Sequence, residues 1–187
     1  STGVMYGQNG DNNSPDSYFK ISAQYRLRPE HRKGYRTLAY DTSKDALFFG
    51  QRARLTFDYK KDNITFYSSI QDSRTWGDEE QRKDIGGLQV NELWLELKLY
   101  KNISVKLGRQ ELAYDDHRIL GNLDWGNLTI SHDALLLKYT NKNKALQWHL
   151  GGAFNQFGEP VFGTNYTLKN YKFLGMTWLK KDLPKMH

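Results

Sequence analysis

Apolar and polar residues alternate along most of this chain, and this alternation limits the folds that it can adopt. In residues 18–28 the odd positions carry Phe, Ile, Ala, Tyr and Leu, whereas the even positions after Tyr18 carry Lys, Ser, Gln and Arg. A period of two places successive side chains on opposite faces of a β-strand. The pattern predicts about eight strands, near residues 18–28, 52–59, 64–71, 92–99, 103–110, 133–139, 146–151 and 173–178.

The assignment of faces is less clear in the sixth segment, because three leucines run together at 135–137. In the eighth segment we assign Leu174, Met176 and Trp178 to the apolar face, against Phe173, Gly175 and Thr177 on the other.

The connections between the predicted strands alternate regularly between long and short. Long segments cover residues 29–46, 77–87, 114–131 and 157–170, and short turns fall near 60–63, 100–102 and 141–144. Outer-membrane barrels have this layout, with short periplasmic turns and longer outer loops. The sequence therefore predicts antiparallel strands of a transmembrane β-barrel in the bacterial outer membrane. The alternative is a soluble ligand-binding β-barrel, as in the lipocalins.

The composition agrees with strands that have one polar face. Only 38% of the residues are hydrophobic and the mean hydropathy is -0.78, yet 14% are aromatic. No run of 18 apolar residues occurs, which excludes a transmembrane helix but not a membrane barrel. Aromatic residues near strand ends fit interfacial girdles, although ordinary strand aromatics would look the same. We expect residues 1–17 to be a flexible N-terminal segment and residues 18–187 to form the barrel domain.

The predicted inner face is highly charged. Eight strands can close only a small barrel, whose interior is largely filled by side chains. This inner face carries Lys20, Arg26, Arg28, Arg52, Arg54, Asp58, Glu92, Glu96, Lys98, Lys106 and Lys138. Long charged groups suit a water-filled lumen better than a packed interior. The chain also ends at a turn-like segment without a terminal aromatic residue, so we expect an incomplete part of a larger barrel.

Arginines dominate the first two predicted strands, in a chain whose net charge is +6. Arg26, Arg28, Arg52 and Arg54 would form a positive ladder that attracts anions, because guanidinium groups stay charged and pair with carboxylates and phosphates. Three acidic residues on the same face could instead balance this charge and leave no preferred solute. These are Asp58, Glu92 and Glu96. Both interpretations stay open.

No arrangement of residues in the sequence predicts catalysis. Glu92 and Glu96 lie roughly 13 Å apart along one strand, whereas glycosidase carboxylates lie about 5 to 9.5 Å apart. Residues 131–133 contain the letters of a Ser-His-Asp triad, but consecutive strand residues point to opposite faces. We therefore predict that the chain is not an enzyme.

A metal, a cofactor or a nucleic acid is not predicted as a partner either. Asp115, Asp116, His117 and Asp124 lack a ligand-spacing signature, so an ordinary loop is favoured over a cation site. The sequence contains isolated glycine pairs rather than a phosphate-binding motif. Its basic residues are spread over every strand and turn, whereas nucleic-acid binding favours a clustered patch.

Four short motifs resemble the alginate-export family of outer-membrane porins, particularly members from the Bacteroidetes. In chain order they are Gln51-Arg52-Ala53-Arg54-Leu55, Gln71-Asp72-Ser73-Arg74-Thr75-Trp76-Gly77, Leu107-Gly108-Arg109-Gln110-Glu111 and the segment from Asp115 to Trp125. The resemblance spans most of residues 18–180. It implies a single-chain barrel of around 18 strands that lets anionic or neutral polysaccharides and small solutes diffuse passively. This chain would then supply the N-terminal part of the wall.

The resemblance also implies which residues line the pore. By analogy Arg52, Arg54 and Arg109 belong to an electropositive lining, although strict alternation from Leu107 points Arg109 outward unless a bulge near Gly108 reverses the phase. The complete predicted lining is Arg26, Arg28, Arg52, Arg54, Glu92, Glu96, Lys106 and Arg109. The partners that we expect are membrane lipid and lipopolysaccharide, small anionic or polysaccharide solutes such as alginate, and the outer-membrane assembly machinery or other outer-membrane proteins.

Overall fold

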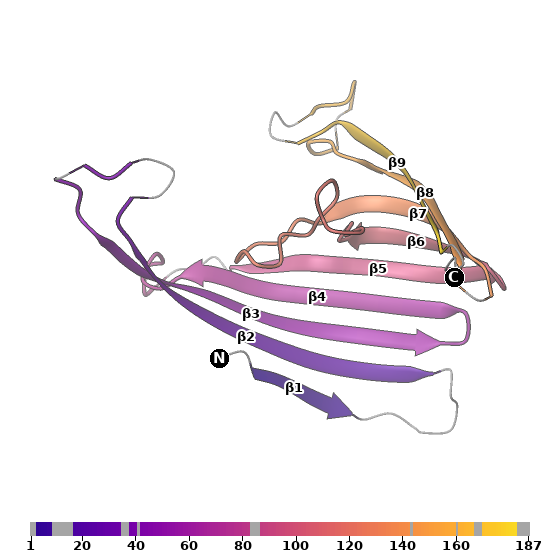
Figure 1. Ribbon diagram of the computed structural model, residues 1–187, viewed down its shortest axis with the longest axis horizontal. Helices are drawn as coiled ribbons and strands as arrows, with labels where there is room; N and C mark the ends of the chain where they lie inside the picture. The colour runs from indigo at the N-terminus through magenta and orange to yellow at the C-terminus, as the bar shows by residue number, and fades with distance from the viewer. Residues whose placement is uncertain are drawn as a thin grey trace, which may run out of the picture.

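The fold is one antiparallel sheet, in which each strand pairs with the strands that precede and follow it in the chain (Figure 1). The computed structural model describes residues 3–8, 17–34, 38–40, 42–82, 87–142, 144–159, 161–166 and 170–182. Its nine described strands are β1 (Gly3–Gln8), β2 (Tyr18–Arg32), β3 (Ala46–Lys61), β4 (Ile64–Thr75), β5 (Leu88–Tyr100), β6 (Ile103–Gln110), β7 (His132–Thr140), β8 (Leu146–Phe154) and β9 (Phe173–Lys181). No helix in this described part is long and apolar enough to cross a membrane.

The structure confirms the antiparallel all-β fold and contains all eight strands that the alternation predicts. It adds β1, which lies within the N-terminal segment that we expected to be flexible and pairs with β2 from Gly3 opposite Tyr25 to Gln8 opposite Lys20. The alternation did not reveal β1 because Val4 to Tyr6 are three apolar residues in a row.

The expected alternation of long and short connections is also present. Only Asp62 and Asn63 separate β3 from β4, and only Lys101 and Asn102 separate β5 from β6. Asp62 takes a positive φ of 51°, which Asp and Asn tolerate better than most residues do. The longer connections cover residues 33–45, 76–87, 111–131 and 155–172. The short turns consequently gather at one end of the sheet, which we call the short-turn end (Figure 1).

The apolar face of the sheet is exposed, which is the reverse of the arrangement in a soluble protein. On β5 the side chains of Leu93, Leu95 and Leu97 are 44%, 36% and 37% exposed. The opposite, polar face contains Arg52, Ser69 and Gln110, each 0% exposed. Large contiguous apolar surfaces on proteins mark contacts with lipid or with partners. An outer-membrane barrel has such an apolar band on its outer surface.

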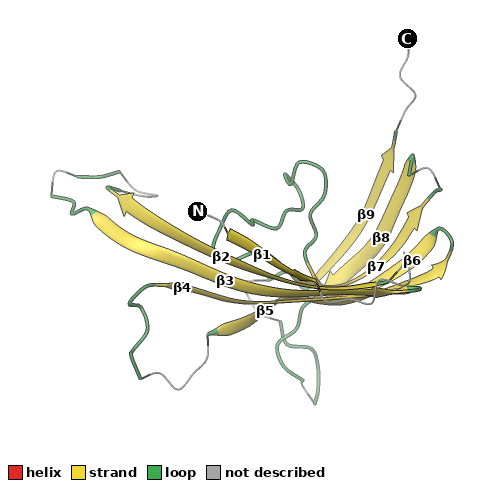
Figure 2. Cartoon of the chain, turned by 90° about the horizontal axis from the view of Figure 1, so that it is seen from below, coloured by secondary structure: helices red, strands yellow, loops and turns green. Residues whose placement is uncertain are grey.

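Few hydrophobic side chains are buried among the described residues. They are Leu112, Ala134, Leu136 and Ala153. Leu136 settles the phase of the interrupted sixth strand, because it lies on the polar face while Leu135 and Leu137 are exposed on the other. The sheet is bent into an open trough rather than packed against a second layer (Figure 2).

The predicted faces of the eighth strand, β9, are wrong. Trp178 pairs with His149, which in turn pairs with Lys138, and this register puts Trp178 on the polar face together with Leu174 and Met176. Phe173 and Leu179 occupy the apolar face and are more than 60% exposed. Alternation could not fix the phase here because both sets of positions contain apolar residues.

The exposed apolar face leads to a prediction about Leu95, which lies near the middle of β5. The Leu95→Arg variant should lose about 2 to 4 kcal/mol of unfolding free energy in lipid vesicles, because the bilayer penalises a charge at its midplane. Urea titration of the folded protein in vesicles measures this loss. Thr65→Arg is the matched control, since Thr65 lies on the polar face opposite Glu96. Equal stability of the two variants would contradict a lipid-facing Leu95.

Candidate functional site

Three arginines of the predicted lining meet on the polar face of β2 and β3. Arg26 lies directly opposite Arg52, and Arg54 lies opposite Gln24 in the adjacent pair on the same face. Like charges at opposed positions of a sheet destabilise it. This grouping therefore needs a counter-charge from another part of the chain.

The counter-charge comes from the 111–131 loop, which joins β6 to β7. Asp124 Oδ1 lies 2.9 Å from Arg52 Nη1 and 3.5 Å from Arg54 Nη1. Arg26 Nη1 donates a 2.8 Å hydrogen bond to the backbone carbonyl of Asp124. A single loop residue therefore binds three guanidinium groups. Such charge-assisted bonds are stronger than neutral ones.

The residues that follow Asp124 extend this contact. Arg28 Nη1 donates to the Trp125 carbonyl at 3.2 Å, and Arg26 also donates to the Gly126 carbonyl. We call Arg26, Arg28, Arg52 and Arg54 the arginine cluster. All four members bind the loop segment 124–126, either through its backbone carbonyls or through the Asp124 carboxylate. The arginine cluster thus holds the 111–131 loop against the polar face.

Arg52 is the most deeply buried member of the arginine cluster. Its side chain is 0% exposed, and burial of a charge is costly unless it is paired and hydrogen-bonded. Besides its bond to Asp124, Arg52 donates to Gln24 Oε1 at 2.7 Å. The Arg54 guanidinium donates to Gln71 Oε1 at 2.8 Å. Neutral amides thus add hydrogen bonds without cancelling the positive charge, although Arg52 Nε is buried without a hydrogen-bond partner.

A second set of contacts fixes the same loop further along the sheet. Ser73 Oγ donates to the Asn127 carbonyl at 3.1 Å, and the Thr129 hydroxyl bonds to Asn91. Gly50 lies close to this segment, and a Cβ there would be 2.5 Å from Asn127 Nδ2, so the Asn127 side chain would have to move. The loop therefore touches β3, β4 and β5 as well as β2.

Glu92, a predicted lining residue, binds the start of the 111–131 loop. Its Oε2 accepts hydrogen bonds from the backbone N–H of Glu111 at 3.0 Å and from Trp94 Nε1 at 3.1 Å. Glu111 in turn accepts from Asn122 Nδ2 at 2.6 Å. Glu92 therefore positions the start of the 111–131 loop.

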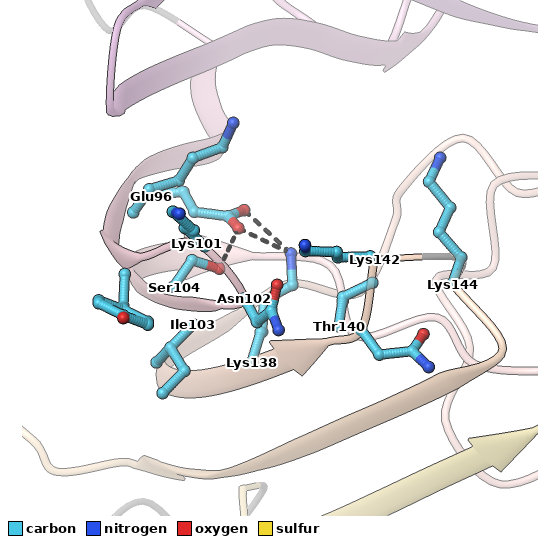
Figure 3. A pocket seen from close by; sticks show the side chains of 12 residues that line it. Glu96, Lys101, Asn102, Ile103, Ser104, Lys138, Thr140, Lys142 and Lys144 are labelled. Atoms are coloured by element: carbon cyan, nitrogen blue, oxygen red, sulfur yellow. Dashed lines mark hydrogen bonds and ion pairs between the residues drawn. The ribbon is translucent and has the colours of Figure 1, made fainter.

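Glu96 and Lys106 lie toward the short-turn end and each has a partner. Glu96 accepts hydrogen bonds from Lys138 Nζ at 3.0 Å and from Ser104 Oγ at 2.6 Å (Figure 3). Lys106 Nζ lies 3.7 Å from the centroid of the Trp94 ring, a cation–π contact. Trp94 also stacks on Tyr67, with 5.1 Å between ring centroids.

Arg109 lies on the opposite face from the other predicted residues. The pairing continues without a shift from Gly108 opposite Trp94 to Arg109 opposite Leu93, so Arg109 shares the apolar face. Gly108 has a positive φ of 123°, yet this local conformation does not reverse the alternation. Arg109 Nη1 lies 3.5 Å from Asp133, and Arg109 Nε donates to the Val90 carbonyl at 3.1 Å.

An aromatic group on the polar face was not predicted from the sequence. The rings of Tyr114, His149 and Trp178 lie within 6 Å of one another between centroids, and Trp178 Nε1 donates to Asp115 at 2.9 Å. Burial raises the pKa of Tyr114 to about 12, so this loop phenol stays protonated at neutral pH. These contacts attach the 111–131 loop to β8 and β9. The sequence could have indicated these contacts only if Trp178 had been assigned to the polar face of β9.

The acidic residues of the loop have partners other than a metal. Asp124 pairs with Arg52, Asp115 bonds to Trp178, and Asp116 pairs with Arg118 at 2.7 Å. Within the described ranges, no group of three or more His, Cys, Asp or Glu residues is placed to hold a metal ion.

A comparison with models of protein families shows to which family this chain belongs. The family model described as alginate export matches residues 17–156, more than half of the chain. The chain belongs to the alginate export family. The match runs from β2 through β8 and includes all eight predicted lining residues. Searches of curated proteins and of solved structures give no significant match.

Family membership confirms the resemblance found in the sequence. Alginate export is a transport family rather than an enzyme family, and its members are of the outer-membrane porin type. Together with the antiparallel sheet, the match supports an export or porin role in the outer membrane. In this member of the alginate export family, ion pairs and hydrogen bonds join the arginine cluster to the 111–131 loop.

The contacts between Asp124 and the arginine cluster predict the effect of the Asp124→Asn substitution. Loss of the carboxylate should lower the unfolding free energy by roughly 1.5 to 3 kcal/mol, because hydrogen bonds to charged groups contribute that much. Amide hydrogen exchange across residues 111–131 should also become faster. Asp116→Asn is the control, since Asp116 pairs only with exposed Arg118 among the described residues. Unchanged exchange in the Asp124 variant would show that the carboxylate does not hold the loop.

Proposed function

We propose that this chain forms part of the wall of an outer-membrane channel for passive diffusion of polar solutes, with a preference for anions. The observation that carries the proposal is the arginine cluster on the polar face of a sheet whose other face is apolar and exposed. In a membrane barrel the apolar face contacts lipid and the polar face surrounds the water-filled lumen. A soluble binding barrel would be expected to bury its apolar face instead.

The charge balance within the arginine cluster favours anions. Its four guanidinium groups contact two carboxylates, those of Asp124 and of Glu30, whose Oε1 lies 2.6 Å from Arg28 Nε. The remaining positive charge raises the local concentration of anions. Glu96 does not offset it, because its carboxylate is paired with Lys138. Glu92 keeps its charge but accepts hydrogen bonds from the Glu111 backbone and from Trp94, and no ion pair joins it to the arginine cluster among the described residues. One of the three acids that could have balanced the arginine ladder is therefore already neutralised.

The 111–131 loop would narrow the channel at the level of the arginine cluster. Because it is bound to the polar face, it occupies space that a lumen would otherwise provide. Long loops of outer-membrane barrels lie at the cell surface and short turns at the periplasm. We therefore assign the short-turn end to the periplasm. Solutes crossing the membrane would pass the arginine cluster beside this loop.

A closed channel requires more strands than those described. Within the described sheet, β1 pairs with β2 alone and β9 with β8 alone, which leaves two open strand edges. An unpaired edge cannot face the hydrocarbon core of a membrane, because its backbone groups would lack hydrogen bonds. We propose that further strands close the barrel. Anionic polysaccharides such as alginate are the cargo that this channel would suit.

Ion selectivity tests the proposed function. Reversal potentials of the full-length protein in planar bilayers, under a salt gradient, should indicate an anion-selective channel. The Arg52→Ser/Arg54→Ser variant should conduct with weaker selectivity, and the difference should shrink as salt increases, since the Debye length falls from about 30 Å at 0.01 M to about 10 Å at 0.1 M. Arg109→Ser provides the control, because Arg109 lies on the apolar face. Cation selectivity, or equal effects of Arg52→Ser/Arg54→Ser and the control, would refute the anion preference.

A further inference from the structure

The polar face contains a second basic feature at the short-turn end, far along the sheet from the arginine cluster. A hollow of about 440 Å³ lies between the β5–β6 turn and the β7–β8 connection (Figure 3). Its lining comes from strands β5, β6 and β7 and from both connections. The lining residues that the argument uses are Glu96, Lys98, Lys101, Lys138, Lys142 and Lys144.

Positive charge in this hollow is almost unopposed. Five of its lining residues are lysines and one, Glu96, is acidic. Glu96 is already bound to Lys138 and Ser104. Throughout the described part of the chain, the structure gives no carboxylate partner to the other four lysines. We call the hollow and its five lysines the lysine basin.

Lys98 and Lys138 belong to strands β5 and β7, and the other three basin lysines come from two separate connections. In Figure 3, Lys101 lies on one side of the Glu96–Lys138 pair and Lys142 and Lys144 lie on the other. Strands β5 and β7 are separated by β6, so the two sides are roughly 10 Å apart at the usual strand spacing. The ammonium groups are thus spread over both sides of the hollow. A flexible chain with repeated negative charges can contact several of them at once.

The lysine basin differs chemically from the arginine cluster. The arginines are bound to the 124–126 segment, whereas the four unpaired lysines are available to a ligand. Lysine ammonium groups are strongly hydrated point charges on flexible stems, which bind anions without the fixed geometry of a guanidinium. Several weak contacts of this kind hold a polyanion by multivalency yet let each charge exchange between neighbours.

We propose that the lysine basin binds carboxylate-bearing polysaccharide chains at the short-turn mouth of the channel and retains them for entry. The inference rests on the proposed channel function and adds a capture site at the end opposite to the long loops. An anionic lipid headgroup offers the same charge chemistry. The basin is lined by Glu96, Ser104 and Lys138 of the polar face, however, and the lipid-facing surface is the apolar one.

Blockade of single channels by a defined polymer tests the lysine basin. The full-length protein is placed in a planar bilayer of phosphatidylcholine, and oligogalacturonate is added to one side at a time. Blockades should be more frequent from the short-turn side, and neutral dextran of equal length should lack this asymmetry. Changing Lys98, Lys101, Lys142 and Lys144 to Gln should reduce the blockade frequency from that side roughly tenfold at 0.1 M salt. Ion conductance without polymer should persist.

A matched variant separates the basin from the general charge of the short-turn end. Lys60, Lys61, Lys180 and Lys181 lie at that end but do not line the hollow. Changing these four to Gln removes the same charge and should reduce blockade less than threefold. Equal effects of the two quadruple variants, or no effect of either, would overturn the proposal.

Three further outcomes identify which part of the account fails. Native mass spectrometry of the detergent-solubilised protein measures whether phosphatidylglycerol stays bound. The polysaccharide proposal would be overturned if the quadruple variant of the basin lysines lost this lipid but still showed normal blockades. Failure of the unmodified protein to conduct ions in the absence of polymer would refute the channel function itself. Normal conductance with symmetric blockades would refute only the lysine basin.

Discussion

The structure depends on one constraint, which is that its described strands pair only with one another, in a single sheet whose two faces meet different surroundings. A strand of period two can present leucines on one side and charged groups on the other without any helix or second layer. Leu93, Leu95 and Leu97 are exposed because this sheet has its apolar face outward, and Arg52 and Gln110 are buried because its polar face binds the loop and neighbouring side chains. In a bilayer this arrangement removes the apolar surface from water and keeps charge in the lumen.

The arginine cluster shows how such a polar face becomes organised. Arg26 and Arg52 repel each other across a strand pair, and the 111–131 loop relieves this repulsion by supplying Asp124 and several backbone carbonyls. The position of the loop therefore depends on the arginine cluster, and the arginine cluster depends on the loop for its counter-charge. The lysines of the short-turn end have no comparable segment among the described residues. In the proposed channel, the arginines would fix the loop beside the passage, and the unpaired lysines would be available to solutes.

Sequence reasoning located the strands well, because alternation is a local property that membrane strands must obey. It placed seven of the eight predicted lining residues on the polar face, where Arg26, Glu92 and Lys106 lie. It could not find the Asp124 contacts, since Arg26 and Asp124 are 98 positions apart and no local pattern connects them. Arg109 illustrates the opposite case: strict alternation pointed it outward, as the structure has it, whereas the family analogy assigned it to the pore. The predicted faces of β9 were wrong because Leu174 and Phe173 are both apolar, so that alternation could not decide between them.

The central claim is that water contacts one face of the sheet and lipid the other. A cysteine scan of residues 92–99 tests it directly, because the chain has no cysteine of its own and each label reports one position. In lipid vesicles, a charged water-soluble thiol reagent should modify positions 92, 94, 96 and 98 rapidly and positions 93, 95, 97 and 99 slowly. Equal reactivity at all eight positions, or faster reaction at the leucines, would contradict the account.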